Sequence, residues 1–228
     1  MPASYDPHLV LDWPNFARLV DIGGTRSFRD GDIFTNGNHG VPQNFAGTDV
    51  ELIDTPYGQG VDMAAASTKS VEVAATNNMG FGPGSFSAEV IIKLGSVPAG
   101  THEILHYNFP SYSSGGWLIN QQGNAAYIYV DQGPPQINAG TYFSEDVGRW
   151  VHMFLVCDSE ADLISLYKNG LFYQSAPGTG WNILDAKPLG FGETTWASPD
   201  ATWARIRVWS KAVSRDEIWN RYINAKRV

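Results

Sequence analysis

The sequence predicts an all-β fold built in layers, and three observations lead to this prediction. The segment Trp150 to Cys157 is apolar at almost every position. Alternate side chains of a strand face opposite sides, so this strand must be covered on both faces. Short segments rich in β-forming residues recur along the chain, and 24 glycines and 13 prolines suit the turns between them.

Two more strands follow this central strand. Asp158 to Asp162 is a short acidic turn, and Leu163 to Tyr167 is again rich in β-forming residues. Asn169 and Gly170 can supply the positive φ angles of a tight hairpin, after which Leu171 to Gln174 returns as the partner strand. The sequence therefore predicts three consecutive antiparallel strands.

The other expected elements are short strands and one C-terminal helix. The strands are Val50 to Ile53, Val71 to Ala74, Ser85 to Leu94, Ile104 to Phe109, Trp117 to Asn120, Ala126 to Val130, Thr141 to Phe143, Pro188 to Phe191 and Ala201 to Trp209. Ser214 and Glu217 then form a capping box, in which the hydroxyl and the carboxylate satisfy free backbone amides. Ile218, Tyr222 and Ile223 follow as one apolar helical stripe.

We expect one folded domain with an N-terminal extension. Residues 1–44 are predicted to be an arm packed on a sandwich formed by residues 45–228. Pro14 argues against a central strand in the arm, and Gly, Asp and Asn are frequent between residues 21 and 41. The 43% of hydrophobic residues and 17% of charged residues argue against disorder.

Charge is distributed unevenly along the chain. The net charge of −8 indicates no nucleic-acid partner. From Arg205 onward there are seven Lys or Arg against Asp216 and Glu217, giving +5, so the first 204 residues carry −13. A basic end on an acidic body could dock one subunit against the next, or it could be a solvated helix face.

Secretion and membrane insertion are not indicated by the sequence. Cys157 is the only cysteine, which precludes an internal disulfide, and its apolar strand favours a buried, inert thiol. The first residues show no basic segment followed by an apolar one, and no apolar run has transmembrane length. We expect no membrane insertion, while a signal peptide removed earlier would leave the same sequence.

Several motifs resemble one known family. These are W-x-H-x-x-L-V-x-D from Trp150, L-Y-x-N-G from Leu166, PLGFG from Pro188, and IRVW-x-x-A-x-S-x-x-E-I from Ile206. Together with the DTPYGQG run at Asp54, they resemble the laminin-G-like members of the concanavalin A-like lectin/glucanase superfamily, from about residue 45 to the end. The resemblance implies a two-sheet antiparallel jelly-roll sandwich, which we expect to carry the short C-terminal helix. It does not fix the activity, because the superfamily holds lectins, hydrolases, lyases and adhesion modules.

The sequence contains one catalytic pattern that its context does not support, and it lacks a second. His102 to His106 reads H-E-x-x-H, the pattern of zinc proteases. That chemistry needs a helix, which brings the two imidazoles within about 6 Å, whereas a strand would separate them by about 13 Å. Some glucanases of the superfamily use an E-x-D-x-x-E strand, and this chain has none; Glu89 has no acidic residue two positions away. We therefore expect a protein that is not an enzyme.

Calcium is the cofactor that the resemblance suggests, because many laminin-G-like domains hold an ion at a loop rim. Asp158, Glu160 and Asp162 alternate in one turn and could supply oxygen ligands. Leu163 stands where an EF-hand loop needs glycine, which favours a solvated turn. Asp30, Asp32 and Asn36 form a second candidate of the same kind.

Three loop aromatics are candidates for sugar binding. Trp181, Trp196 and Tyr112 lie in segments that read as loops, with Asn, Ser or Thr nearby. A flat ring beside hydroxyl and amide groups can stack on a sugar, although such a ring can also pack its loop onto the sandwich.

These observations predict a non-catalytic structural or adhesion component of a larger assembly. A bacteriophage virion protein, in capsid decoration or the tail, reconciles a lectin-like fold with the lack of disulfides, because it is made in the bacterial cytoplasm and works outside. Its partners would be itself or another virion protein, and surface glycans. A secreted, extracellular carbohydrate-binding module and a polysaccharide hydrolase or lyase are the alternatives.

Overall fold

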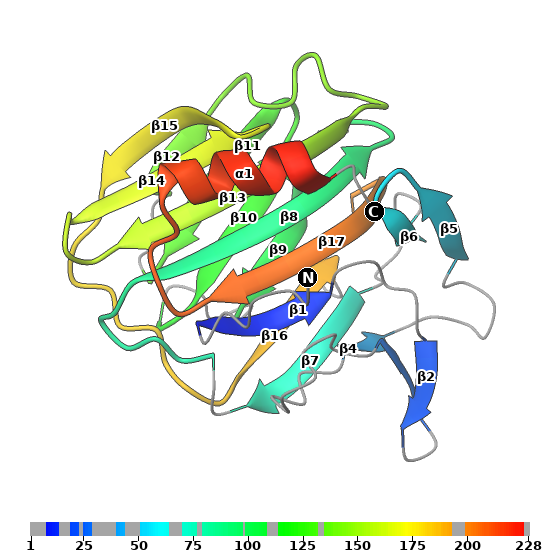
Figure 1. The fold of residues 1–228 in the computed structure, drawn as a ribbon, viewed down its shortest axis with the longest axis horizontal. Coiled ribbons are helices and arrows are strands. Elements are labelled where there is room, and N and C mark those ends of the chain that lie inside the picture. The colour runs from blue at the N-terminus through cyan, green and yellow to red at the C-terminus, as the bar shows by residue number, and fades with distance from the viewer. Residues whose placement is uncertain are drawn as a thin grey trace.

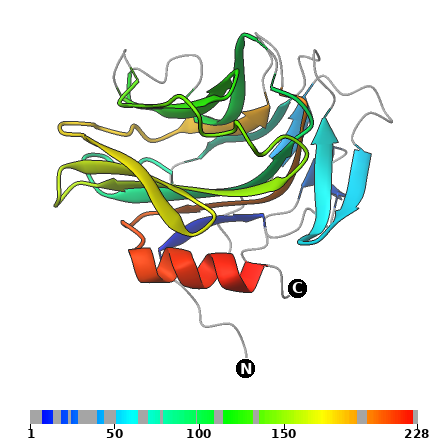
Figure 2. The same cartoon turned by 90° about the horizontal axis from the view of Figure 1, so that it is seen from above.

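Two antiparallel sheets and one helix, α1 (Arg215–Ala225), make up the described part of the chain. The computed structural model describes residues 8–13, 19–22, 25–28, 40–43, 51–63, 70–76, 79–97, 99–108, 114–131, 135–192 and 199–225. The sheets stack face to face (Figures 1 and 2). This arrangement confirms the predicted jelly-roll sandwich with a C-terminal helix. Within these residues, no helix has the length and apolar character needed to cross a membrane.

The first sheet has eight strands among the described residues. In spatial order they are β15 (Leu171–Pro177), β14 (Leu163–Lys168), β13 (Trp150–Asp158), β8 (Phe86–Leu94), β17 (Ala201–Trp209), β6 (Gly58–Met63) and β5 (Glu51–Thr55), with β1 (Leu9–Trp13) paired to β17. β13 pairs with β8 on one side and β14 on the other, so the predicted central strand lies inside the sheet. Asn169 and Gly170 turn the following hairpin with φ angles of 52° and 78°.

The second sheet has nine strands among the same residues. In spatial order they are β12 (Ile137–Ala139), β11 (Ala125–Val130), β10 (Trp117–Gln122), β9 (Thr101–Tyr107), β16 (Lys187–Gly192), β7 (Ser70–Thr76), β4 (Gly40–Gln43), β3 (Thr25–Phe28) and β2 (Leu19–Ile22). Strands β1 to β4 come from the segment expected to be an arm, and they extend both sheets. The boundary between residues 44 and 45 lies outside the described residues, and the division there stays a prediction.

The core lies between the sheets, and α1 covers the outer face of the first one. On β8, Phe86, Ala88, Val90 and Ile92 face the core, so the alternate residues point outward. Those outward residues are nevertheless buried, because α1 crosses this face (Figure 2). Ile218 packs there beside Phe154 and Trp209, and Ala225 packs beside Ile91.

Two local predictions were wrong. Thr141 to Phe143 form a turn after β12 instead of a strand. Tyr142 and Phe143 are fully buried there, and the Tyr142 hydroxyl donates to the Tyr167 carbonyl at 2.9 Å, so packing overrides their preference for strands. The expected helical stripe is also incomplete, because Ile223 is 41% exposed.

The capping box is half formed. The Ser214 hydroxyl accepts the backbone N–H of Glu217 at 3.3 Å. The Glu217 carboxylate instead binds Arg221 at 2.7 Å and Lys211 at 3.4 Å. A capping box does not include basic residues. Here the two ion pairs hold the Glu217 carboxylate away from the free amides at the start of the helix.

Candidate functional site

A small cavity lies at one edge of the sandwich, where the β13–β14 turn meets the segment after β15. It has a volume of about 200 Å³ and is lined by Pro83, Ser159, Asp162, Gly178, Thr179, Gly180 and Trp181. We call it the rim cavity. It brings together Asp162, a predicted calcium ligand, and Trp181, a predicted sugar contact.

Local hydrogen bonds fix the acidic turn that forms one wall of the rim cavity. The Asp158 carboxylate accepts the backbone N–H groups of Glu160 at 3.0 Å and Ala161 at 3.1 Å. Asp162 ends the turn in the left-handed region, with a φ of 51°, which Asp tolerates better than most residues. Its carbonyl accepts the N–H of Gly178 at 3.0 Å, which joins the two walls.

Ser159 ties the turn to the start of β8. Its hydroxyl lies 3.0 Å from the Ser85 hydroxyl, which also accepts the Ser159 backbone N–H at 3.0 Å. Gly178 is required on the opposite wall, because a Cβ there would lie 2.5 Å from Ile164 and 3.0 Å from Trp181. The walls are therefore held by backbone and short side chains, which limits how far they can move.

Trp181 is a wall of the rim cavity and not an exposed stacking surface. Its side chain is 4% exposed, and its indole N–H donates to the Gly84 carbonyl at 3.0 Å. The ring packs the loop onto the sandwich, which is the second of the two roles that its sequence context allowed. Tyr112 and Trp196 lie outside the described residues, so their role in sugar binding stays a prediction.

Calcium binding by Asp158, Glu160 and Asp162 stays a prediction, because their side chains do not form a ligand cluster. Among the described residues, no three Asp, Glu, His or Cys side chains are arranged to hold a metal ion. The reason is local, since the Asp158 carboxylate is already bound to backbone amides and Glu160 is exposed outside the cavity. Asp30, Asp32 and Asn36 lie outside the described residues.

The H-E-x-x-H residues form part of strand β9, with a bulge at Ile104. Asn120 of β10 pairs with Glu103 and Ile119 pairs with Leu105, so one β9 residue is extra. The bulge shifts the alternation, and Glu103 and His106 therefore share the outer face and contact each other at 2.9 Å. His102 pairs in register with Gln121 on the other side of the bulge. In the part of the chain that the structure describes, no three His, Cys, Asp or Glu side chains could together hold a metal ion.

The polar groups of the rim cavity suit a ligand rich in hydroxyls. The Asp162 carboxylate accepts hydrogen bonds, while the Ser159 and Thr179 hydroxyls can both donate and accept. Asp162 and Thr179 are exposed, so a ligand can reach them from solvent. Thr179 and its flanking glycines were not predicted as contacts, although the GTGW sequence beside Trp181 is the signal that could have indicated them.

Comparisons with known proteins give a family match and similar solved structures. A family model described as the concanavalin A-like lectin/glucanases superfamily matches residues 66–219. No curated protein matches in sequence. The receptor binding domain of botulinum neurotoxin D superimposes with a TM-score of 0.68 at 16% identity, covering 95% of this chain and 52% of that one.

Two further structures show the same likeness. The binding domain of Paraclostridial Mosquitocidal Protein 1 gives a TM-score of 0.67 at 14% identity, over 94% of this chain and 52% of that one. The binding domain of botulinum neurotoxin DC in complex with SialylT gives a TM-score of 0.66 at 16% identity, over 96% of this chain and 52% of that one. The chain thus spans about half the length of these structures, and the likeness concerns the fold. By its family match, the chain belongs to the concanavalin A-like lectin/glucanases superfamily.

Proposed function

We propose that this protein is a non-catalytic adhesion component of a larger assembly and that it binds a saccharide in the rim cavity. The observation that carries the proposal is the cavity itself, in which one carboxylate, two hydroxyls and two glycine backbones surround a buried tryptophan edge. Sugar-binding sites combine such polar groups with an aromatic wall. A structural neighbour binds SialylT, which makes surface glycans the first ligand class to test.

The first prediction concerns Asp162. A glycan array should identify a saccharide, and titration calorimetry should then show at least tenfold weaker binding by Asp162→Ala, because hydrogen bonds to a charged group contribute about 1.5–3 kcal/mol each. Glu160→Ala, in the same turn but outside the cavity, should bind as the unaltered protein does. Equal losses in both variants, or no loss in Asp162→Ala, would contradict the proposal.

The assembly we propose is a bacteriophage virion, with a secreted carbohydrate-binding module as the alternative. What supports an assembly role is an exposed apolar surface on α1 and the β14–β15 hairpin. It comprises Phe172 (49% exposed), Trp219 (42%) and Ile223 (41%). The hairpin and helix adjoin, since a Cβ at Gly170 would lie 2.8 Å from Trp219. Exposed apolar patches of this kind mark contacts between proteins.

The second prediction tests this apolar surface with a second copy of the chain as its partner. Sedimentation velocity of the purified protein should show concentration-dependent association. Phe172→Ser/Ile223→Ser should remain monomeric, because the apolar area that association would bury is lost. A chain that stays monomeric at every concentration would overturn self-association through this surface.

A further inference from the structure

A second cavity lies between β17 and α1, on the opposite side of the first sheet from the core. Its volume is about 540 Å³, and its lining residues are Arg205, Arg207, Glu217, Asn220, Arg221, Asn224 and Ala225. We call it the arginine cavity. Three basic residues of the C-terminal end, Arg205, Arg207 and Arg221, line this cavity.

The lining of the arginine cavity is rich in guanidinium groups. Three guanidinium groups and one carboxylate line it, and the carboxylates of Glu89 and Asp12 contact Arg207 beside the cavity. Asn220 and Asn224 lie four residues apart on one face of α1 and add amide groups to the same lining. Guanidinium groups bind carboxylate and phosphate oxygens in a bidentate way, and amides bind hydroxyls.

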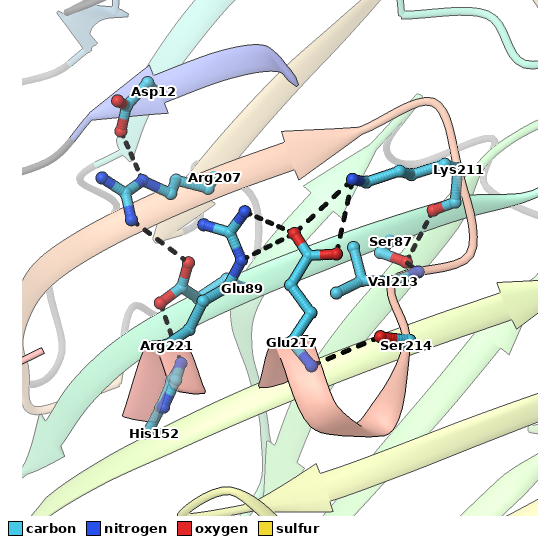
Figure 3. A network of polar contacts seen from close by, with 10 residues as sticks. All are labelled: Asp12, Ser87, Glu89, His152, Arg207, Lys211, Val213, Ser214, Glu217 and Arg221. Atoms are coloured by element: carbon cyan, nitrogen blue, oxygen red, sulfur yellow. Dashed lines mark hydrogen bonds and ion pairs between the residues drawn. The ribbon is translucent and has the colours of Figure 1, made fainter. Parts of the chain in front are cut away.

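Neighbouring side chains hold two of the arginines in place. Arg207 donates from Nε to Asp12 at 2.6 Å, and its Nη1 lies 3.8 Å from Glu89 (Figure 3). Arg221 binds Glu217 through Nε and Nη2 and lies over the Trp209 ring, 4.4 Å from its centroid. The guanidinium groups are thus positioned before any ligand arrives, which lowers the entropy cost of binding.

Arg205 has the least favourable surroundings of the three. It is 5% exposed. Burial lowers the pKa of its guanidinium, and the positive charge of Arg207 lowers it further, against the opposing effect of Glu89. For Arg207 the effect of burial is outweighed by Glu89 and Asp12, so its pKa is raised. An anion in the cavity would therefore relieve the repulsion at Arg205.

We propose that the arginine cavity binds a polar ligand that carries an oxyanion, of the size of one acidic saccharide unit. The cavity, of about 540 Å³, has room for a sugar ring beside the oxyanion. The two asparagine amides are placed to bind that ring. This site is separate from the rim cavity, and neither proposal depends on the other.

Three sugars that share the glucose ring and differ in the group at carbon 6 test the proposal. Glucuronate and glucose 6-phosphate should each bind at least tenfold more tightly than glucose, by calorimetry at a constant ionic strength of about 0.15 M. If only one of the two acids shows this preference, the oxyanion is that acid's carboxylate or phosphate. If neither does, the proposal is wrong.

Charge variants locate the binding. Arg205→Gln should lose the preference for acidic sugars by at least tenfold, whereas Arg215→Gln, at the start of α1 and outside the cavity, should change it by less than twofold. Because Arg205 is buried, the exposed Asn220→Asp variant provides a second test that leaves the arginines intact and should also remove the preference. Equal effects of Arg205→Gln and Arg215→Gln would overturn the site.

Discussion

At the scale of single residues, a largely buried chain of charged groups connects four strands beneath α1. Glu89, fully buried on β8, contacts His152 of β13 at 2.8 Å and Arg207 of β17 at 3.8 Å. Arg207 then binds Asp12 of β1 (Figure 3). The Tyr222 ring of α1 stacks on His152, with 5.9 Å between ring centroids. One carboxylate thus joins the sheet, the N-terminal strand and the helix.

Glu89 stays ionised in this setting. Burial opposes its charge, but the hydrogen bond to His152 and the positive charges of His152, Arg207 and Arg205 outweigh burial and lower the pKa of Glu89 to about 2. The pKa is thus lower in the folded state than the ordinary value of 4.5. Its contribution to stability, on the order of 3 kcal/mol, is therefore complete above pH 4.5 and lost as the pH falls through 2.

The third prediction follows from Glu89. Glu89→Gln should lower the free energy of unfolding at neutral pH by about 3–5 kcal/mol, because it leaves buried positive groups without their carboxylate. Its stability should also vary less between pH 4.5 and pH 2 than that of the unaltered protein. Urea unfolding across this pH range measures both effects. Glu160→Gln, at an exposed carboxylate, should change stability by less than about 0.5 kcal/mol. An unchanged acid profile in Glu89→Gln would contradict this account.

At the scale of elements, α1 depends on packing more than on its own sequence. A helix of 11 residues is marginal alone in water. It is held by the buried residues Ile218 and Ala225 and by Arg221 stacked over Trp209. Since α1 also forms one wall of the arginine cavity, that cavity exists only when the helix is packed on the sheet.

The fourth prediction concerns the start of α1. Ser214→Ala removes the hydroxyl that accepts the Glu217 N–H, and it should cost about 1 kcal/mol of stability. Ser214→Gly should cost only a few tenths of a kcal/mol, because glycine is tolerated at this position. Thermal unfolding of the two variants measures the difference. A larger loss in the glycine variant would show that the hydroxyl is not what begins the helix.

Residues close together in the sequence were sufficient to predict some structural elements and insufficient to predict others. The hairpin at Asn169-Gly170 and the helix start at Ser214 were predicted, because each depends on residues a few positions apart. The bulge at Ile104 was not, since it is defined by the pairing of β9 with β10. Without it, the contact between Glu103 and His106 could not be anticipated.

At the scale of the whole molecule, the first and the last of the described strands pair within one sheet. β1 pairs with β17, with Leu9 opposite Trp209 and Trp13 opposite Ile206. Asp12 reaches Arg207 across this pairing. The family match begins at residue 66, so this N-terminal strand lies outside the matched region.

The layered fold could be predicted from the apolar central strand, whereas the two cavities could not. The walls of the rim cavity come from positions as far apart as Pro83 and Trp181. Trp181 illustrates the difficulty, because its segment reads as a loop and only the hydrogen bond to Gly84 shows that the ring is buried. The basic end was visible as a cluster of charges, but its position beneath the helix depends on tertiary packing.

The measurement that tests the central claim most directly is a titration of isotope-labelled protein with the saccharide that the array selects, followed by amide and indole NMR signals. We predict saturable shifts confined to Asp162, the Gly178–Gly180 segment and the Trp181 indole, with the signals of α1 unchanged. Shifts that arise elsewhere on the sandwich, with the signals of the rim cavity unchanged, would contradict the claim that this cavity is the binding site.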